Sequence, residues 1–181
     1  FNFWAMTGVV SGGLYGDKNT CSPYFFPPCD HHTTGQYKPC GDSQPTPACV
    51  KKCQDGYPVD YKSDKRKGTA YRVAKDVKQI QQEIITNGPV EASYTVYSDF
   101  PSYKSGVYVK HSTQQLGGHA VKIIGWGNEG GIPYWLIANS WNEDWGLKGF
   151  FKIRRGTDEC GIEDGIVAGI PKVSLADELT F

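Results

Sequence analysis

The sequence predicts an α+β fold with a loop region held by disulfides and a region built on a β-sheet. Residues 16–68 are dense in Pro, Gly, Cys and charged residues and follow neither the helical nor the strand hydrophobic period. Residues 69–171 carry one helix pattern near 76–87 and then a series of strand patterns. With 181 residues, the chain is long enough to bury an apolar core.

The charge balance excludes some classes of partner. Lys and Arg number 19, as do Asp and Glu, so the formal net charge is zero. A neutral chain gives no reason to expect nucleic acid or an anionic membrane surface as partner, and no apolar run approaches the length that spans a bilayer. We therefore expect a peptide or protein partner, no nucleic acid and no membrane. The first residues, 1–4, resemble neither an initiator methionine nor a signal peptide, so we expect an internal start.

The N-terminal part of the chain predicts little regular structure. Residues 1–15 are expected to contain the last turns of a helix, ended near Gly8, and a crossover. Residues 16–68 follow as one long irregular region that disulfides hold in place of a core. Irregular loops of this length are usually functional.

A helix is predicted near residues 76–87. Asp76 can cap its first turn, and Gln79 occupies the capping-box position. The pair Gly88-Pro89 ends it. Apolar residues recur at helical spacing inside it: Val77, Ile80 and Ile84.

The rest of the chain predicts a mostly antiparallel sheet. Strand-like segments are separated by glycine-rich turns such as Gly130-Gly131. The expected strands are residues 90–97, 119–126, 134–140, 149–154 and 166–170. Residues 172–181 form a C-terminal tail.

Two motifs on neighbouring strands indicate a histidine–asparagine pair. His119 follows Gly117-Gly118, and Asn139 comes 20 residues later, where a returning strand would place it. A histidine that acts as a general base needs an orienting group, and an amide oxygen can fix its tautomer. The alternatives are a core histidine and a turn asparagine; we favour the pair because an amide inside an apolar strand needs a hydrogen-bond partner.

The cysteines do not supply a nucleophile for this pair. None of the six sits where a helix N-terminus would lower its pKa. Five lie in residues 16–68 and indicate a disulfide framework, which predicts a lysosomal, endosomal or secreted location. The six are Cys21, Cys29, Cys40, Cys49, Cys53 and Cys160.

Six stretches carry a family resemblance: VSGGLY (10–15), PPCDHH (27–32), VYSDF (96–100), GHA (118–120), YWLIANSWNEDWG (134–146) and CGIE (160–163). By their order and spacing the chain resembles the papain-like cysteine proteases of the cathepsin B type over residues 1–171. The resemblance implies a papain-like fold, in which residues 69–171 form the barrel-like right-hand domain and residues 1–15 the end of a left-domain helix and the crossover. It also implies that the catalytic cysteine lies on a preceding segment or light chain, and that this chain is a C-terminal or heavy-chain portion.

The resemblance implies roles for residues around the pair. His119 becomes the imidazolium partner of the thiolate and then the general acid to the leaving amine, while Asn139 holds its other ring nitrogen. Trp141 covers their hydrogen bond; taken alone it is equally consistent with a core aromatic. Gly118 lets the substrate backbone approach. Ala120 lines the pocket for the second residue upstream of the scissile bond.

His31 and His32 form a second candidate site. They could be solvated loop residues, or join Cys29 and Cys40 in a zinc site; we expect no metal and no cofactor, because a secretory context favours disulfides over thiolates. The resemblance implies an occluding loop, whose two imidazoles accept the C-terminal carboxylate of a peptide and allow dipeptide removal.

Disulfide pairing follows only by resemblance. It implies two bonds within the chain, one bond to a preceding segment and one free thiol. The two bonds within the chain are Cys21–Cys53 and Cys29–Cys40. Cys49 forms the bond to the preceding segment, and Cys160 is the free thiol. A Cys49–Cys160 bond remains the alternative.

Two positions depart from the family pattern. Tyr37 stands where an arginine usually bridges to the aspartate that matches Asp144, and Gly165 stands where a glutamate often forms the floor of the second-residue pocket. We expect a cathepsin B-like thiol peptidase portion with carboxydipeptidase capacity, inactive by itself, and by resemblance a propeptide and cystatin-type inhibitors as partners. The alternative is a secreted, catalytically inactive papain-fold protein that serves as a binding or matrix protein.

Overall fold

A computed structural model describes residues 1–172. The chain divides into two compact units. Among the described residues, the first contains residues 1–28, 41–70 and 169–172, and the second contains residues 29–40 and 71–168. Within the expected 16–68 region, residues 29–40 cluster with the sheet and the other residues with the first unit. The C-terminal tail beyond residue 172 lies outside the described residues.

The first unit has little regular structure. Helix α1 (Asn2–Met6) buries no side chain, and β1 (Gly12–Gly13) pairs in parallel with β2 (Ser22–Pro23). Strand β3 (Gly68–Arg72) runs from this unit into the second. Over residues 1–172, the only buried apolar side chains that belong to this unit are its disulfide cysteines, Cys21 and Cys53.

A buried carboxylate organises the first unit. Asp64 accepts hydrogen bonds from the Ser11 amide at 2.6 Å, the Ser11 hydroxyl at 2.8 Å and the Tyr57 hydroxyl at 2.7 Å. Three donors compensate the burial of one charge, because hydrogen bonds to an ionised acceptor are stronger than neutral ones. Hydrogen bonds and a disulfide therefore replace an apolar core in this unit.

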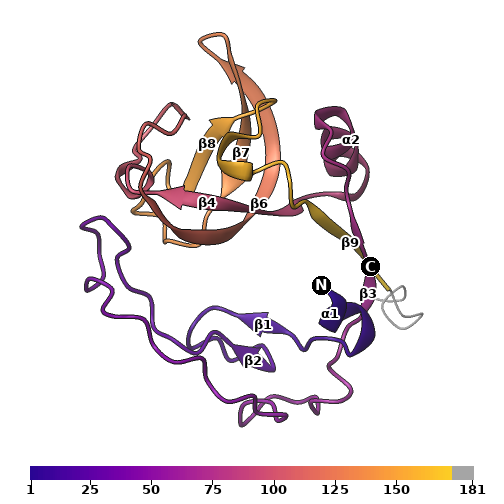
Figure 1. Ribbon diagram of the computed structural model, residues 1–181. Coiled ribbons are helices and arrows are strands. Elements are labelled where there is room, and N and C mark those ends of the chain that lie inside the picture. The colour runs from indigo at the N-terminus through magenta and orange to yellow at the C-terminus, as the bar shows by residue number, and fades with distance from the viewer. Residues whose placement is uncertain (173–181) are drawn as a thin grey trace. The chain divides into compact units, whose positions relative to one another are not determined.

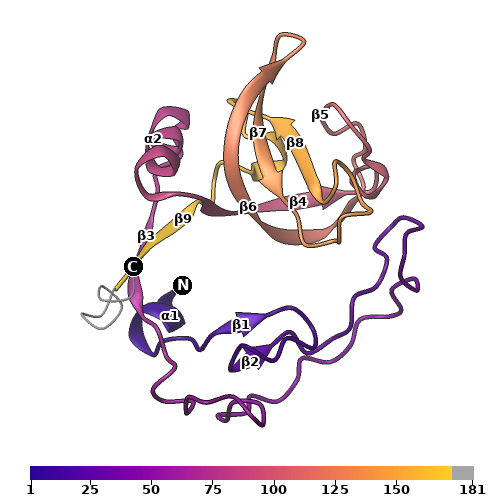
Figure 2. The ribbon, with the colours of Figure 1, turned by 180° about the vertical axis from the view of Figure 1, so that it is seen from behind.

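The second unit is a sheet with one long helix. Helix α2 (Val77–Asn87) begins as predicted, because Asp76 accepts a hydrogen bond from the Gln79 amide at 2.9 Å and Ile80 is fully buried. It ends at Gly88, whose φ of 96° favours glycine. Figures 1 and 2 show α2 beside the sheet. Among described residues no helix is long and apolar enough to cross a membrane.

The sheet is mostly antiparallel, as expected. Its strand order is β3-β9-β4-β6-β7-β8-β5, and β5 pairs with β8 in parallel. The remaining strands and short helices are β4 (Val90–Tyr97), η1 (Phe100–Ser102), β5 (Val107–Tyr108), β6 (Gln115–Glu129), β7 (Ile132–Ala138), β8 (Phe150–Arg154), η2 (Glu159–Gly161) and β9 (Val167–Pro171). Strand β6 curves strongly along its length (Figures 1 and 2).

The sheet is open, which corrects the expectation of a barrel-like domain. Strands β3 and β5 are its two edges, and the strand order does not close on itself. Strand β5 has only two residues and pairs in parallel with β8 on one side. Its free side therefore offers few backbone groups with which another strand could pair to close the sheet into a barrel.

An aromatic core fills the second unit. Phe100 is fully buried and its ring lies 4.8–6.4 Å, centroid to centroid, from six other aromatic rings. These belong to Tyr94, Tyr103, Tyr108, Trp141, Trp145 and Phe151. Aromatic pairs of this kind add to the stability that buried area alone provides.

A second buried carboxylate fixes the segment that leads to Gly165. Glu163 accepts hydrogen bonds from Trp135 Nε1 at 2.9 Å, the Gly156 amide at 2.6 Å and the Asp158 amide at 3.0 Å. A buried acceptor with three donors has little freedom to move, because each lost bond leaves a buried polar group unpaired. Glu163 therefore holds the backbone in one position two residues before Gly165.

Candidate active site

His119 and Asn139 form a hydrogen-bonded pair in the second unit. His119 lies on β6, and Asn139 directly follows β7, its antiparallel neighbour. The His119 Nε2 and Asn139 Oδ1 atoms are 2.8 Å apart. The structure thus brings together the two residues that the sequence motifs single out.

The orientation of the Asn139 amide defines the histidine tautomer. The Ser140 backbone N–H donates to Asn139 Oδ1 at 2.8 Å, so an acceptor must occupy that position. The same oxygen faces His119, and because it can only accept, Nε2 carries the proton. Nδ1 of His119 is then free to accept a proton from another group. The Asn139 nitrogen is buried without a hydrogen-bond partner in the described chain.

Trp141 joins the pair to the core. Its ring stacks on His119 with centroids 5.2 Å apart and an interplanar angle of 21°. It also contacts Phe100 and Trp145 at centroid distances of 5.6 and 4.9 Å. Trp141 therefore packs against the aromatic core with one part of its ring and against His119 with another, so the two interpretations of this residue are compatible.

His31 and His32 lie against the same indole ring. The ring of His31 is parallel to Trp141 within 10°, at 5.9 Å, and the His32 centroid is 5.0 Å away. His32 has a left-handed backbone with φ of 53°. Burial lowers the pKa of His31 below 6.5, and the nearby charges of His32 and His119 lower it further. Three imidazoles thus surround one tryptophan.

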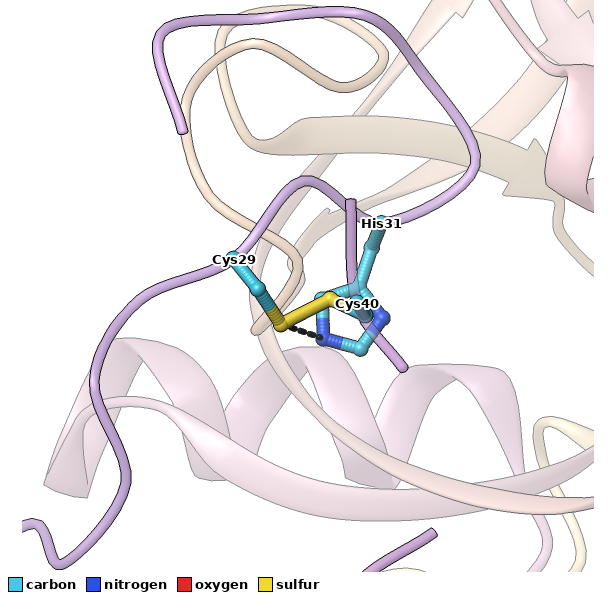
Figure 3. Close-up of side chains that lie close together, drawn as sticks. All are labelled: Cys29, His31 and Cys40. Atoms are coloured by element: carbon cyan, nitrogen blue, oxygen red, sulfur yellow. Dashed lines mark hydrogen bonds between the residues drawn. A yellow bond between two sulfur atoms is a disulfide. The ribbon is translucent and has the colours of Figure 1, made fainter. Parts of the chain in front are cut away.

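The zinc alternative does not fit the loop as it is folded. Cys29, His31 and Cys40 bring three ligand atoms within 4.8 Å of one another. Figure 3 shows, however, that the two sulfurs are bonded to each other. His31 Nε2 is 3.9 Å from Cys29 Sγ. A disulfide offers no thiolate, and the thiolate is the form that binds zinc.

Gly118, Ala120 and Gly165 are located beside strand β4. Ser93 is paired with Ala120, and Thr95 with Gly118, so each pair shares a face of the sheet. Gly118 and Ala120 are exposed, and a Cβ added at Gly118 would meet nothing within 4 Å. A Cβ added at Gly165 would lie 2.8 Å from Ser93 Oγ.

Sequence reasoning missed two neighbours of these residues. Ser93 is the most exposed member of the outward-facing set on β4, and Tyr94 is paired with His119, with ring centroids 5.9 Å apart. The alternation of β4 could have marked Ser93 as outward-facing. Only the strand register connects either residue with the site.

The cysteines behave as the resemblance implies for two pairs. The bonds Cys21–Cys53 and Cys29–Cys40 are both formed. Cys49 is exposed and Cys160 half-buried, and neither is in a disulfide in the described part of the chain. Burial, followed by the neighbouring Glu159, raises the pKa of the Cys160 thiol to about 12. Cys160 therefore stays protonated at neutral pH and is a poor nucleophile.

The family follows from a match over almost the whole chain. Residues 1–170 match the papain family cysteine protease model. With the histidine–asparagine pair on the sheet, this match defines the class: the chain belongs to the papain family of cysteine proteases. The family resemblance and the α+β fold class read from the sequence are thereby confirmed.

Within the family the relatives are cathepsin B-like. The chain is 52% identical to cathepsin B-like cysteine proteinase 6 of Caenorhabditis elegans, covering 96% of this chain and 47% of that protein. It is 50% identical to a cathepsin B-like cysteine proteinase of Schistosoma japonicum, covering 95% of this chain and 51% of that one. It is also 52% identical to cathepsin B-like cysteine proteinase 3 of Ostertagia ostertagi, with 94% and 99% covered. The chain thus spans about half the length of the first two relatives.

Solved structures agree with this assignment. Procathepsin B S9 of Trypanosoma congolense superposes with a TM-score of 0.76 at 34% identity, over 96% of this chain and 52% of that one. Digestive procathepsin L2 of Tenebrio molitor larval midgut gives 0.53 at 30% identity, over 67% and 42%. Coverage is therefore wider for the cathepsin B structure than for the cathepsin L structure.

Proposed function

We propose that this chain supplies the histidine and asparagine of a Cys-His-Asn peptidase site, with the cysteine on a segment outside this sequence. The observation that carries the proposal is the 2.8 Å hydrogen bond between His119 Nε2 and Asn139 Oδ1. In the neutral ring this bond places the proton on Nε2, so Nδ1 of His119 is the nitrogen that can take a proton from a thiol. Family membership supports the reaction class.

The proposed reaction has two halves. The thiolate attacks the peptide carbonyl and forms a thioester, while His119 gives its acquired proton to the leaving amine. His119 then takes a proton from water, whose oxygen attacks the thioester; the carbon–sulfur bond breaks, the carboxylic acid product is released, and the thiolate leaves paired with protonated His119. Asn139 keeps the ring in one orientation through both halves by accepting from Nε2.

Substitutions in the complete protein test this assignment. His119→Ala should lower kcat/KM for peptide hydrolysis by at least the factor of about 10²–10⁴ typical of general acid–base groups. Asn139→Ala should cause a smaller loss, because the ring remains but its orientation is no longer fixed. His111→Ala is the matched control, since this residue is exposed and its side chain makes no hydrogen bond within residues 1–172; its backbone amide donates to Asp99. Undiminished activity of the His119 variant would refute the assignment, as would inhibitor-sensitive activity of the 181-residue chain alone.

The loop histidines are proposed to confer carboxydipeptidase activity. Both rings lie against Trp141, which also stacks on His119, so a peptide C-terminus bound there would end close to the catalytic pair. A carboxylate stabilises the imidazolium form and so opposes the lowered pKa of His31. Carboxylate binding should therefore take up a proton and strengthen as the pH falls below 6.5.

The double variant His31→Ala, His32→Ala tests this role. In the complete enzyme we expect slower removal of C-terminal dipeptides, with internal cleavage retained or faster. The measurement is kcat/KM for one peptide with a free C-terminus and for the same peptide with an amidated C-terminus. Equal losses on both substrates would mean that the histidines serve folding instead.

The second-residue pocket is proposed to favour apolar side chains. Gly118 leaves room for the substrate backbone, Ala120 lines the pocket, and Gly165 provides neither the charge nor the bulk of the glutamate often found there. Asp164 does not substitute, because it is exposed and pairs with Lys75 at 3.3 Å. We therefore expect Phe, Leu or Val to be preferred over Arg at this substrate position.

Gly165→Glu should restore cleavage of Arg-Arg substrates relative to Phe-Arg substrates by about tenfold or more, as expected for a charge-assisted hydrogen bond. Gly165→Gln is the matched control, since both side chains require the same rotation of Ser93 and only one carries charge. The measurement is the ratio of kcat/KM for the two dipeptidyl amides. Efficient Arg-Arg cleavage by the unsubstituted enzyme would contradict the pocket assignment.

Partners and location follow from the same proposal. The two superposed structures are procathepsins, which supports a propeptide as a partner, and we propose cystatin-type inhibitors as further partners. Two formed disulfides support an oxidising compartment, lysosomal, endosomal or extracellular.

A further inference from the structure

The turn that follows Asn139 contacts the 29–40 loop at two points. The side-chain amide of Asn142 donates a hydrogen bond to the backbone carbonyl of Cys29. Farther along the loop, the Gln36 backbone amide donates to Asp144 at 3.3 Å. Both contacts lie within the second unit, so the loop with the histidines is attached to the same turn that carries Trp141.

The Asn142 contact is at the base of the histidine pair. The carbonyl that it binds belongs to Cys29, two residues before His31, and Cys29 is also fixed to Cys40 by the disulfide. The Asp144 contact is weaker, because 3.3 Å is long for an N–H···O bond and Gln36 is exposed. Asn142 therefore holds the part of the loop from which the imidazoles extend.

The backbone of Asn142 is also unusual. Its φ of 64° lies in the left-handed region, which asparagine tolerates better than most residues. Lys148, in the segment just before β8, has a similar φ of 52° but is exposed, and no loop residue is among its hydrogen-bond partners in the described chain. The backbone conformation and the hydrogen bond can thus be tested separately.

Ion pairing does not attach the loop. Over residues 1–172, none of the salt bridges involves residues 29–40, and Tyr37 supplies no charge that could pair with Asp144. Inside the loop, buried Asp30 accepts from the Gly35 and Tyr37 amides and keeps the loop compact. The outward attachments are the two hydrogen bonds and the ring contacts with Trp141.

We propose that Asn142 is a positioning residue that holds His31 and His32 against Trp141 and thereby sets the ratio of carboxydipeptidase to endopeptidase activity. The inference rests on the proposed function of the two histidines. Without the Asn142 bond, the disulfide still joins Cys29 to Cys40, but the backbone at Cys29 is no longer held against the turn that follows Asn139. A free C-terminus then meets misplaced imidazoles, while internal cleavage does not require them.

Three variants of the complete enzyme separate the possible causes. Asn142→Asp keeps the shape and the tolerance of a left-handed backbone but has no N–H donor at neutral pH. Asn142→Gly removes the amide and makes the backbone conformation free of strain. Lys148→Gly is the matched control for the left-handed backbone. Both Asn142 variants should lower the ratio of kcat/KM for free to amidated peptides by about two- to tenfold, the range for one neutral hydrogen bond, and the Lys148 variant should not.

Amide hydrogen exchange supplies a readout that does not depend on activity. With the nucleophile blocked, both Asn142 variants should exchange faster in residues 29–40 and not in β4 or β6. Unchanged exchange together with an unchanged ratio would overturn the inference. Faster exchange with an unchanged ratio would also overturn it, because the contact would then hold the loop without affecting the ratio. If the double variant His31→Ala, His32→Ala also leaves the ratio unchanged, the carboxydipeptidase proposal on which the inference rests has failed.

Discussion

The two units of the chain are stabilised in different ways. The second unit buries an aromatic core around Phe100, and its strands carry His119 and precede Asn139. The first unit buries its disulfide cysteines and the Asp64 carboxylate, while large apolar side chains such as Leu14 and Phe25 are 84% and 68% exposed. The His119–Asn139 pair is therefore located where packing defines position most closely, because close-packed side chains tolerate little displacement.

The loop of residues 29–40 combines both modes. It belongs to the second unit, yet it is held by a disulfide, the Asp30 hydrogen bonds and the Asn142 contact in place of an apolar core. Because this loop has no apolar core, we expect the proposed carboxylate-binding residues, His31 and His32, to be displaced more readily than the proposed general base, His119, when solution conditions change. Three experiments test how far the comparison holds.

The largest effect is expected from the aromatic core. Phe100→Ala should reduce the free energy of unfolding by about 3–5 kcal/mol, because it leaves a cavity among six aromatic rings. Phe25→Ala, the matched change in the first unit, should cost less than about 0.5 kcal/mol because its ring is exposed. Denaturant unfolding of the complete protein measures both. Similar losses would show that the two units are stabilised alike.

A slightly smaller loss is expected from each disulfide. Removing Cys21–Cys53 by double Ser substitution should cost about 4 kcal/mol, and removing Cys29–Cys40 about 3 kcal/mol, by the chain-entropy relation for loops of 32 and 11 residues. The near-UV circular dichroism of the buried tryptophans should persist in the Cys21–Cys53 variant. Loss of that signal would mean that the first unit supports the core of the second.

The smallest effect is a difference in acid response. Burial lowers the pKa of His31 below 6.5, so as the pH falls below 6.5 the unfolded chain takes up the proton first and the folded loop loses stability. For Asp64, burial raises the pKa, but hydrogen bonds from Ser11 and Tyr57 outweigh it and the net shift is downward. Its stabilisation is present above pH 3.8 and is lost as the pH falls below that value.

Hydrogen exchange at a series of pH values, corrected for the intrinsic rate, distinguishes the two responses. Residues 29–40 should loosen first, below pH 6.5, and residues 57–64 only below pH 3.8. His31→Ala should abolish the first phase and leave the second. Loosening of both segments over one pH range would contradict the assignment of separate groups.

Local patterns predicted the regular elements that local chemistry determines. The capping box at Asp76 places α2 within one residue of its start, and β4 has the bounds that its alternation predicts. Strand β6 is longer than predicted, because its first residues, before His119, are exposed and lack the apolar pattern. The short strands β1, β2 and β5 have two residues each, too few for a period. The open edge at β5 depends on pairing with β8, which no local pattern contains.

The candidate site was predictable where residues fall at a spacing that a strand pair imposes. His119 and Asn139 meet that condition, and the resemblance identified His31 and His32. Ser93 and Asn142 could not be found in this way, because their contacts depend on strand register and on a left-handed turn. The division of the chain was also beyond local patterns, since residues 29–40 join the second unit through contacts with residues more than 100 positions away.

The thiol of Cys160 has a practical consequence for labelling. Its pKa is raised to about 12 and its side chain is half-buried, so it should react slowly with alkylating reagents at neutral pH, whereas Cys49 is exposed. In the folded chain, a thiol titration should therefore count one fast group, and a second should become reactive only on denaturation. In the proposed complete protease, Cys160 should for the same reason contribute little to rapid alkylation, so a rapid loss of activity would report on the proposed catalytic thiol and not on Cys160.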